Sequence, residues 1–146
     1  MQPEGLQSLV NCLYREGIRI SIETNGTYTK PAWWTKVDMW IPDIKCPSSG
    51  VHEPLLSEWL YLRARDQIKF VVGTREDLLF VDHVLRDYPN SNSTILVSPC
   101  LSLRKDGTLT HESREWLSIV ADFCKESDVR LSLQIHKFIW GAKRGV

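Results

Sequence analysis

Hydrophobic and polar residues follow two different periods along the chain, which indicates strands alternating with helices. Leu6, Leu9, Val10 and Leu13 recur at helical spacing, whereas residues 18–23 alternate as a strand does. The expected strands are 18–23, 39–45, 67–72, 94–98 and 129–135. The expected helices are a segment from Leu6 that ends at Gly17 and segments at 31–37, 54–63, 74–88 and 110–125, and the basic, aromatic stretch 136–146 is expected as a tail.

This order of elements predicts an α/β fold. Strands that alternate with helices form βαβ units, so we expect about five mostly parallel strands with flanking helices. The chain has 146 residues and shows no internal repeat or linker. We therefore expect one domain that spans residues 1–146.

Composition and charge narrow the classes of partner. Hydrophobic residues make up 42% of the chain and charged residues 25%, with 18 basic and 18 acidic side chains and a formal net charge of +0. A neutral chain has no strong field for nucleic acid or anionic lipid, so we expect a small molecule as partner, with no nucleic acid and no membrane. No apolar run could span a bilayer and no signal peptide begins the chain, which favours a cytoplasmic location.

Polar residues gather where the expected strands end. The residues concerned are Glu23, Asn25, Asp43, Lys45, Ser98, Gln134 and His136. Ligands of parallel sheets bind at the carboxyl edge, because side chains from several strands converge there. Each residue also has a structural interpretation: Glu23 could cap a turn, Lys45 could be a solvated loop lysine, Ser98 could belong to a turn, and His136 could be a core histidine.

Three segments resemble one family of enzymes. Residues 22–27 (Ile-Glu-Thr-Asn-Gly-Thr) resemble the third barrel strand of radical S-adenosylmethionine (SAM) enzymes. Residues 38–50, with Asp-Ile-Lys before a Pro-Ser loop, and residues 134–146, with Gln-Ile-His, Ile-Trp-Gly and a closing Arg-Gly-Val, resemble the 7-carboxy-7-deazaguanine synthases. The resemblance covers nearly the whole chain and corresponds to the C-terminal portion of that family.

The resemblance implies a fold and a reaction. The fold would be a partial (β/α) barrel of the radical SAM type. The reaction would convert 6-carboxy-5,6,7,8-tetrahydropterin to 7-carboxy-7-deazaguanine with loss of ammonia, a lyase step toward queuosine. SAM, a [4Fe–4S] cluster and Mg²⁺ would be the cofactors, and the radical chemistry would belong to the cofactor rather than to a catalytic side chain.

The resemblance also implies residue roles. The residues that would bind SAM are Asp43, Ile44, Lys45, Ser98, Pro99, Cys100, Leu101 and Gln134, with Lys45 at the SAM carboxylate. The residues that would bind the substrate are Glu23, Asn25, His136 and Val146. Many members of the family have Gln-Pro where this chain has Ser98-Pro99.

The cysteines do not match those of a complete member of the family. Cys12, Cys46, Cys100 and Cys124 lie far apart and form no three-cysteine motif, and the family's Gly-Gly-Glu-Pro segment is absent. We therefore expect no cluster on this chain and no activity from it alone. Two missing strands would leave an unpaired sheet edge near Ile18, which predicts a homodimer or other self-association.

Two other functions are compatible with the sequence. One is another radical SAM enzyme, such as an activase for a glycyl-radical enzyme, because Asp-x-Lys after the fourth strand occurs there too. The other is a non-catalytic α/β module that self-associates or binds a partner through its exposed edge.

Overall fold

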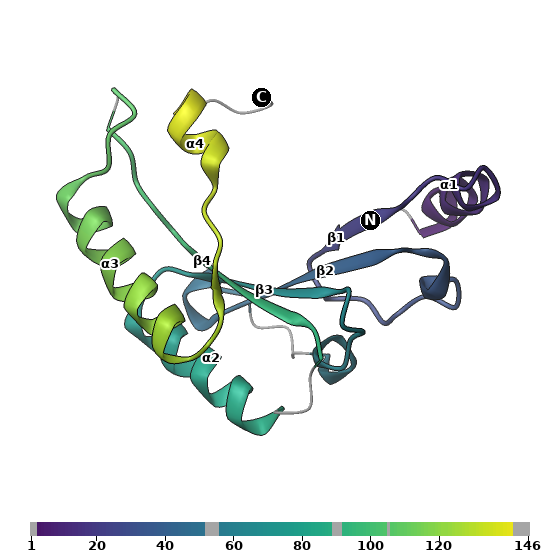
Figure 1. Cartoon of the computed structure of the whole chain (residues 1–146), viewed down its shortest axis with the longest axis horizontal. Coiled ribbons are helices and arrows are strands. Elements are labelled where there is room, and N and C mark those ends of the chain that lie inside the picture. Colours follow the sequence, from purple (N-terminus) through teal and green to yellow (C-terminus); the bar gives the residue numbers. More distant parts are fainter. Residues whose placement is uncertain (1–2, 52–55, 89–91, 105, 142–146) are drawn as a thin grey trace.

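Five parallel strands form one sheet whose order follows the chain, β1-β2-β3-β4-β5 (Figure 1). The computed structural model describes residues 3–51, 56–88, 92–104 and 106–141. The strands are β1 (Ser21–Thr24), β2 (Met39–Ile44), β3 (Gln67–Val72), β4 (Thr94–Pro99) and β5 (Arg130–Leu131). The helices are α1 (Pro3–Arg15), α2 (Arg75–Asp87), α3 (His111–Glu126) and α4 (Ile135–Trp140), with 3₁₀-helices η1 (Trp34–Lys36), η2 (Pro47–Ser49) and η3 (Ser57–Leu60). The predicted α/β fold is confirmed.

The strand order determines which face of the sheet the helices cover. Crossovers between consecutive parallel neighbours have one hand, so they place their helices on one face, as in the wall of a (β/α) barrel. The ring of Phe70 in β3 meets Phe80 of α2 with 6.4 Å between centroids. Trp116 of α3 donates its Nε1–H to the Val72 carbonyl at 3.2 Å. Both helices therefore pack on the same face (Figure 1).

The covered face holds the hydrophobic core. Ile68, Phe70 and Val72 alternate along β3 and are almost completely buried, as is Trp40 in β2. Each such side chain stabilises the fold by about 1.5–3 kcal/mol relative to exposure. The intervening residues of each strand point to the opposite face, which α2 and α3 leave open.

The helices expected at 74–88 and 110–125 lie within one residue of α2 and α3, whereas α1 begins at Pro3, three residues before the expected start. α1 ends before Gly17, whose φ of +68° is the left-handed conformation that glycine tolerates. α2 begins after Thr74, whose side chain accepts a hydrogen bond from the Asp77 N–H in a reciprocal capping box. One detail was wrong: Leu79, predicted to lie in the buried stripe of α2, is 70% exposed. None of the helices in the described ranges is long and apolar enough to cross a bilayer.

Three predicted elements are shorter than expected. β1 begins at Ser21 rather than at residue 18, because the Ile20 N–H donates to the Asp38 carboxylate at 2.7 Å instead of joining a ladder. The helices predicted at 31–37 and 54–63 are only the 3₁₀ turns η1 and η3, with residues 52–55 outside the described ranges. Packing explains η3, because its buried Trp59 donates its indole N–H to the Tyr28 carbonyl.

The last strand was also predicted too long. β5 spans only two residues, and the chain then turns into α4 instead of extending to residue 135. The Ser132 N–H still donates to the Val97 carbonyl at 2.9 Å. In a parallel ladder the next bond would come from the N–H of residue 99, which is proline and has none. The ladder therefore ends there.

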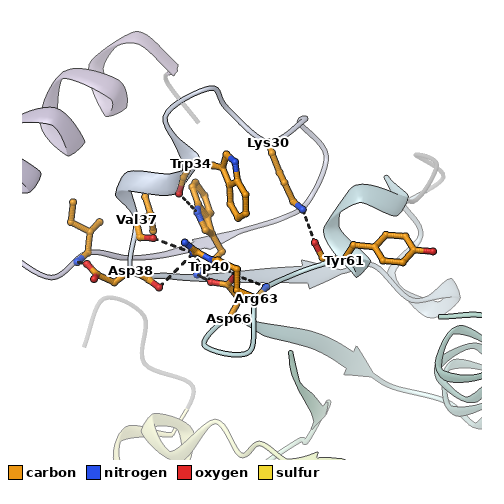
Figure 2. Close-up of polar contacts among 9 residues, drawn as sticks. Lys30, Trp34, Val37, Asp38, Trp40, Tyr61, Arg63 and Asp66 are labelled. Carbon is orange, nitrogen blue, oxygen red and sulfur yellow. Dashed lines mark hydrogen bonds and ion pairs between the residues drawn. The ribbon is translucent and has the colours of Figure 1, made fainter. Parts of the chain in front are cut away.

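A buried ion pair fixes the amino ends of β2 and β3 (Figure 2). Asp66, fully buried just before β3, accepts hydrogen bonds from the Trp40 N–H at 2.9 Å and from the Arg63 backbone and guanidinium at 2.8–3.0 Å. The guanidinium stacks 4.8 Å from the Trp34 ring centroid and donates to the Val37 carbonyl. Burial would raise the pKa of Asp66, but these hydrogen bonds outweigh it and hold the pKa below its ordinary value.

Candidate functional site

The predicted site residues of three strands share the open face of the sheet. In the register, Glu23 lies beside Ile41, Asp43 beside Lys69, and Ser98 beside Val71. Neighbours in a parallel ladder point to the same face, and so do residues two apart along a strand. Glu23, Asp43 and Ser98 therefore project from the face that α2 and α3 do not cover, toward its carboxyl edge.

Three buried oxygens on this part of the molecule have no partner. Within the described ranges, the buried side-chain atoms that lack a hydrogen bond are Asp43 Oδ1, Ser98 Oγ and Gln134 Oε1. A buried polar atom without a partner costs about 1–3 kcal/mol, so native proteins seldom keep one without a use. All three belong to the set that the resemblance assigned to SAM. Within the described part of the chain, these three acceptors near the carboxyl edge thus remain unpaired.

Lys45 adds a cation to this edge. Its Nζ lies 2.8 Å from Asp43 Oδ2, and both side chains are about one-third exposed. The pair leaves Asp43 Oδ1 free for another donor. An anionic group that reached Lys45 would share the ammonium with Asp43, since a lysine has three N–H donors.

Two of the other predicted cofactor residues, Ile44 and Pro99, point to the covered face. Ile44 is 2% exposed and sits beside Phe70 on the covered face, and Pro99 sits beside Val72 on the same side. Cys100 is exposed and donates its N–H to the Val72 carbonyl at 2.8 Å, while Leu101 is half-buried in the following loop. A role in binding SAM remains a prediction for all four predicted residues.

The predicted substrate residues are less concentrated. Glu23 is exposed on the open face, and Asn25 accepts hydrogen bonds from the N–H and hydroxyl of Thr27 within its own turn. His136 was expected at a strand end, but it lies exposed in the first turn of α4, because β5 ends early. Val146 lies outside the described residues.

Sequence reasoning missed the group that fixes the loop after Lys45. The buried Asp77 carboxylate accepts hydrogen bonds from the Ser48 N–H and hydroxyl at 2.9 and 2.5 Å, and from the N–H groups of Gly73 and Thr74 at 2.7 and 3.0 Å. Burial would raise its pKa, but these bonds lower it overall. A Cβ on Gly73 would lie 3.2 Å from Ser48 Oγ, so a larger residue there would require a small shift of the Ser48 side chain. Only the Thr-x-x-Asp spacing hinted at part of this network.

The cysteines at the site are not arranged as metal ligands. Cys46 is buried, and burial together with the negative charges of Asp77 and Asp43 raises the pKa of its thiol to about 12. All four cysteines are free. Within the described residues, no three His, Cys, Asp or Glu side chains are grouped so that they could hold a metal ion.

Comparison with known proteins identifies the family that this chain resembles. No family model matches the chain. It is 32% identical over 141 residues to the 7-carboxy-7-deazaguanine synthase of Methanospirillum hungatei, covering 95% of this chain and 54% of that protein. It is 34% identical to the enzyme of that name from Koribacter versatilis and 31% identical to the one from Clostridium acetobutylicum, each 64% covered. The predicted resemblance to the 7-carboxy-7-deazaguanine synthases is confirmed.

The extent of the match matters for function. The alignments cover 95–98% of this chain but only 54–64% of these three 7-carboxy-7-deazaguanine synthases. The chain thus spans between about half and two thirds of each relative's length. It corresponds to a part of the complete enzymes.

Proposed function

We propose that this chain forms the SAM- and pterin-binding part of a 7-carboxy-7-deazaguanine synthase, a radical SAM lyase. The three buried, unpartnered oxygens of Asp43, Ser98 and Gln134 carry this proposal. They sit on residues that the resemblance assigns to SAM, and a ligand rich in N–H and O–H groups would satisfy them. SAM, bound with a [4Fe–4S] cluster, would supply the hydrogen-abstracting radical chemistry.

The side chains of the site would bind and orient the cofactor. Lys45 would hold the SAM carboxylate as a point charge while keeping its contact with Asp43. Asp43 Oδ1 would accept an N–H from the ligand. Ser98 Oγ, fully buried on β4, would bond the adenosine, and Gln134 at the start of α4 would close the same edge.

Glu23 would bind the pterin ring through hydrogen bonds. It projects from the open face one row of the sheet below Asp43. A carboxylate accepts two N–H groups side by side, which suits the amino and ring N–H groups of a pterin. His136 would approach the substrate from α4. The role proposed for Val146 concerns a residue outside the described ranges.

The described side chains include no group of three His, Cys, Asp or Glu that could hold a metal ion. The proposal therefore names no ligands on this chain for the cluster or for Mg²⁺. The expectation that the chain alone is inactive remains a prediction. We place the protein in the cytoplasm, where four free thiols are the normal state of cysteine.

Ser98→Ala tests the proposal. Removing a buried hydroxyl that has no partner should raise the free energy of unfolding by about 1 kcal/mol. The same change should weaken S-adenosylhomocysteine binding about 3- to 10-fold, the value of one neutral hydrogen bond. Urea denaturation and titration calorimetry would measure the two effects.

A matched control makes this test selective. Ser118→Ala removes an exposed hydroxyl from α3 and should change neither quantity. If the chain binds neither S-adenosylhomocysteine nor 6-carboxypterin, the proposed function is wrong for this chain. If Ser98→Ala is stabilised but binds the nucleoside as tightly as the wild type, the site lies elsewhere.

We also propose that the chain self-associates through the edge at β1. β1 is the first strand in the order of the described sheet and pairs only with β2. Leu9 and Tyr14 of α1 and the nearby Ile18 are each more than half exposed. An apolar surface beside an open strand edge favours pairing with a second copy.

Sedimentation of an Ile18→Lys variant tests this edge. The wild type should sediment as a dimer or larger species and the variant as a monomer, because a charge in the exposed apolar surface beside the strand edge opposes pairing. Leu79→Lys changes an apolar residue on α2 that is even more exposed than Ile18, and it should leave the association intact. A monomeric wild type would contradict the proposal.

A further inference from the structure

Lys69 is a cation on the open face that neither motif nor resemblance singled out. It lies in the middle of β3, the central strand, between Ile68 and Phe70, which point into the helix-covered core. Lys69 therefore points to the open face, and its side chain is half-buried there. The register places it beside Asp43 on one side and Leu96 on the other.

The ionic contacts around Lys69 leave its charge uncompensated. Among the described residues, no hydrogen bond, ion pair or ring contact joins Lys69 to another side chain. Asp43 beside it pairs with Lys45 through Oδ2, while its Oδ1 has no partner. Ordering a long lysine side chain here costs side-chain entropy that a valine at this position would not.

The neighbourhood is suited to an anionic ligand rather than to water. Leu96 flanks Lys69 and Val71 follows it on the same face, so two of the positions next to this lysine on the open face are apolar. Ser98, with its free Oγ, lies beside Val71 in the next row toward the carboxyl edge. Lys69 thus lies beside Asp43 and one row from Ser98, two of the residues whose oxygens have no partner.

We propose that Lys69 binds the carboxylate of a ligand on the open face. This inference rests on the proposed function, which supplies two ligands with a carboxylate: SAM, through its methionine moiety, and the 6-carboxypterin substrate. Lys45 and Lys69 then divide two anionic groups between them. Lys69 acts as a substrate- or cofactor-binding residue and takes no part in proton transfer.

Two pairs of ligands test the role of Lys69. S-adenosylhomocysteine and 5′-methylthioadenosine differ by the amino acid moiety, and 6-carboxypterin and pterin differ by the carboxylate. In the wild type, one ligand with a carboxylate should bind at least about tenfold more tightly than its partner, as expected for a charge-assisted contact. In Lys69→Met that preference should fall to about twofold or less, while affinity for the partner without the carboxylate is unchanged. A response of the pterin pair leaves the SAM carboxylate to Lys45, whereas a response of the S-adenosylhomocysteine pair assigns that carboxylate to Lys69 instead.

Two control variants distinguish the loss of the Lys69 charge from a general effect of substitution on folding. Lys69→Arg keeps the charge and should retain most of the preference, whereas Lys125→Met, on the exposed part of α3, should keep all of it. If Lys69→Met does not fold, reductive methylation of the wild type with ¹³C-formaldehyde gives a direct signal. The Lys69 resonance should shift with the carboxylate ligand and not with its partner.

The outcomes are distinguishable. If Lys69→Met folds and retains both preferences, or if the Lys69 resonance ignores every carboxylate ligand, the inference is wrong while the proposed function stands. If the wild type binds none of the four ligands, the proposed function fails and the inference fails with it.

Discussion

Replacing Asp66 with alanine is expected to lower the free energy of unfolding by about 3–5 kcal/mol, the cost of breaking a buried ion pair by removing one partner. Asp66 is fully buried and takes hydrogen bonds from Trp40 and from the backbone and side chain of Arg63. The variant leaves the Arg63 guanidinium and two N–H groups without their acceptor (Figure 2). Urea denaturation followed by tryptophan fluorescence would measure the loss.

Asp122→Ala is the control for this prediction. Asp122 lies exposed on α3, so its removal should change stability by less than about 0.5 kcal/mol. A second variant, Arg63→Met, should also destabilise the fold, because it leaves the Asp66 carboxylate buried without its cation. If Asp66→Ala is no more harmful than Asp122→Ala, the ion pair does not hold the amino ends of the strands.

Replacing Asp77 with alanine should lower the free energy of unfolding by about 2–4 kcal/mol, because a helix cap is lost and buried donors are left unpaired. The carboxylate joins the start of α2 to Ser48 in the loop after Lys45. Its loss should also release that loop and weaken binding at Lys45. Urea denaturation measures the first effect, and S-adenosylhomocysteine titration of the folded variant measures the second.

The ionisation of Asp77 should make the stability of the fold depend on pH. The pKa of Asp77 in the folded chain lies below the ordinary value of 3.8. The ionised carboxylate therefore stabilises the fold fully above that pH, and this stabilisation disappears as the pH falls through the folded pKa. The wild type should therefore lose stability below about pH 4, and Asp77→Asn should lose less over the same interval.

The matched control for Asp77→Ala is Glu76→Ala, which removes an exposed neighbour in the same helical turn. It should lower the free energy of unfolding by only about 0.3–1 kcal/mol. Equal effects of Glu76→Ala and Asp77→Ala would contradict the assigned network.

Local pattern predicted the strands that are buried and the helices that are capped. β3 was predicted with its observed bounds, because Ile68, Phe70 and Val72 alternate with polar residues and Gly73 follows. α2 was predicted at 74–88, within one residue of its observed bounds at each end. Prediction failed where distant residues decide the backbone: Pro99 in β4 ends the pairing of β5, and Asp38 takes the N–H of Ile20 before β1.

The same division applies to the candidate site. The sequence placed Asp43 and Ser98 at strand ends, and strand alternation with parallel order was enough to predict a shared edge. The sequence could not show that the side-chain oxygens of Asp43, Ser98 and Gln134 are buried without partners. Burial depends on residues that are distant in the chain and close in the fold. His136 lies in α4 rather than at a strand end, because β5 ends early.

Local periodicity and motifs were enough to establish the α/β class, the central strands and the resemblance to the 7-carboxy-7-deazaguanine synthases. The folded arrangement was needed to establish that Lys69 lies beside Asp43, that Asp77 holds the loop after Lys45, and that the buried Asp66 links the amino ends of β2 and β3. These relations join residues far apart in the chain. Their energies come from desolvation and from partners in space, which periodicity along the chain does not record.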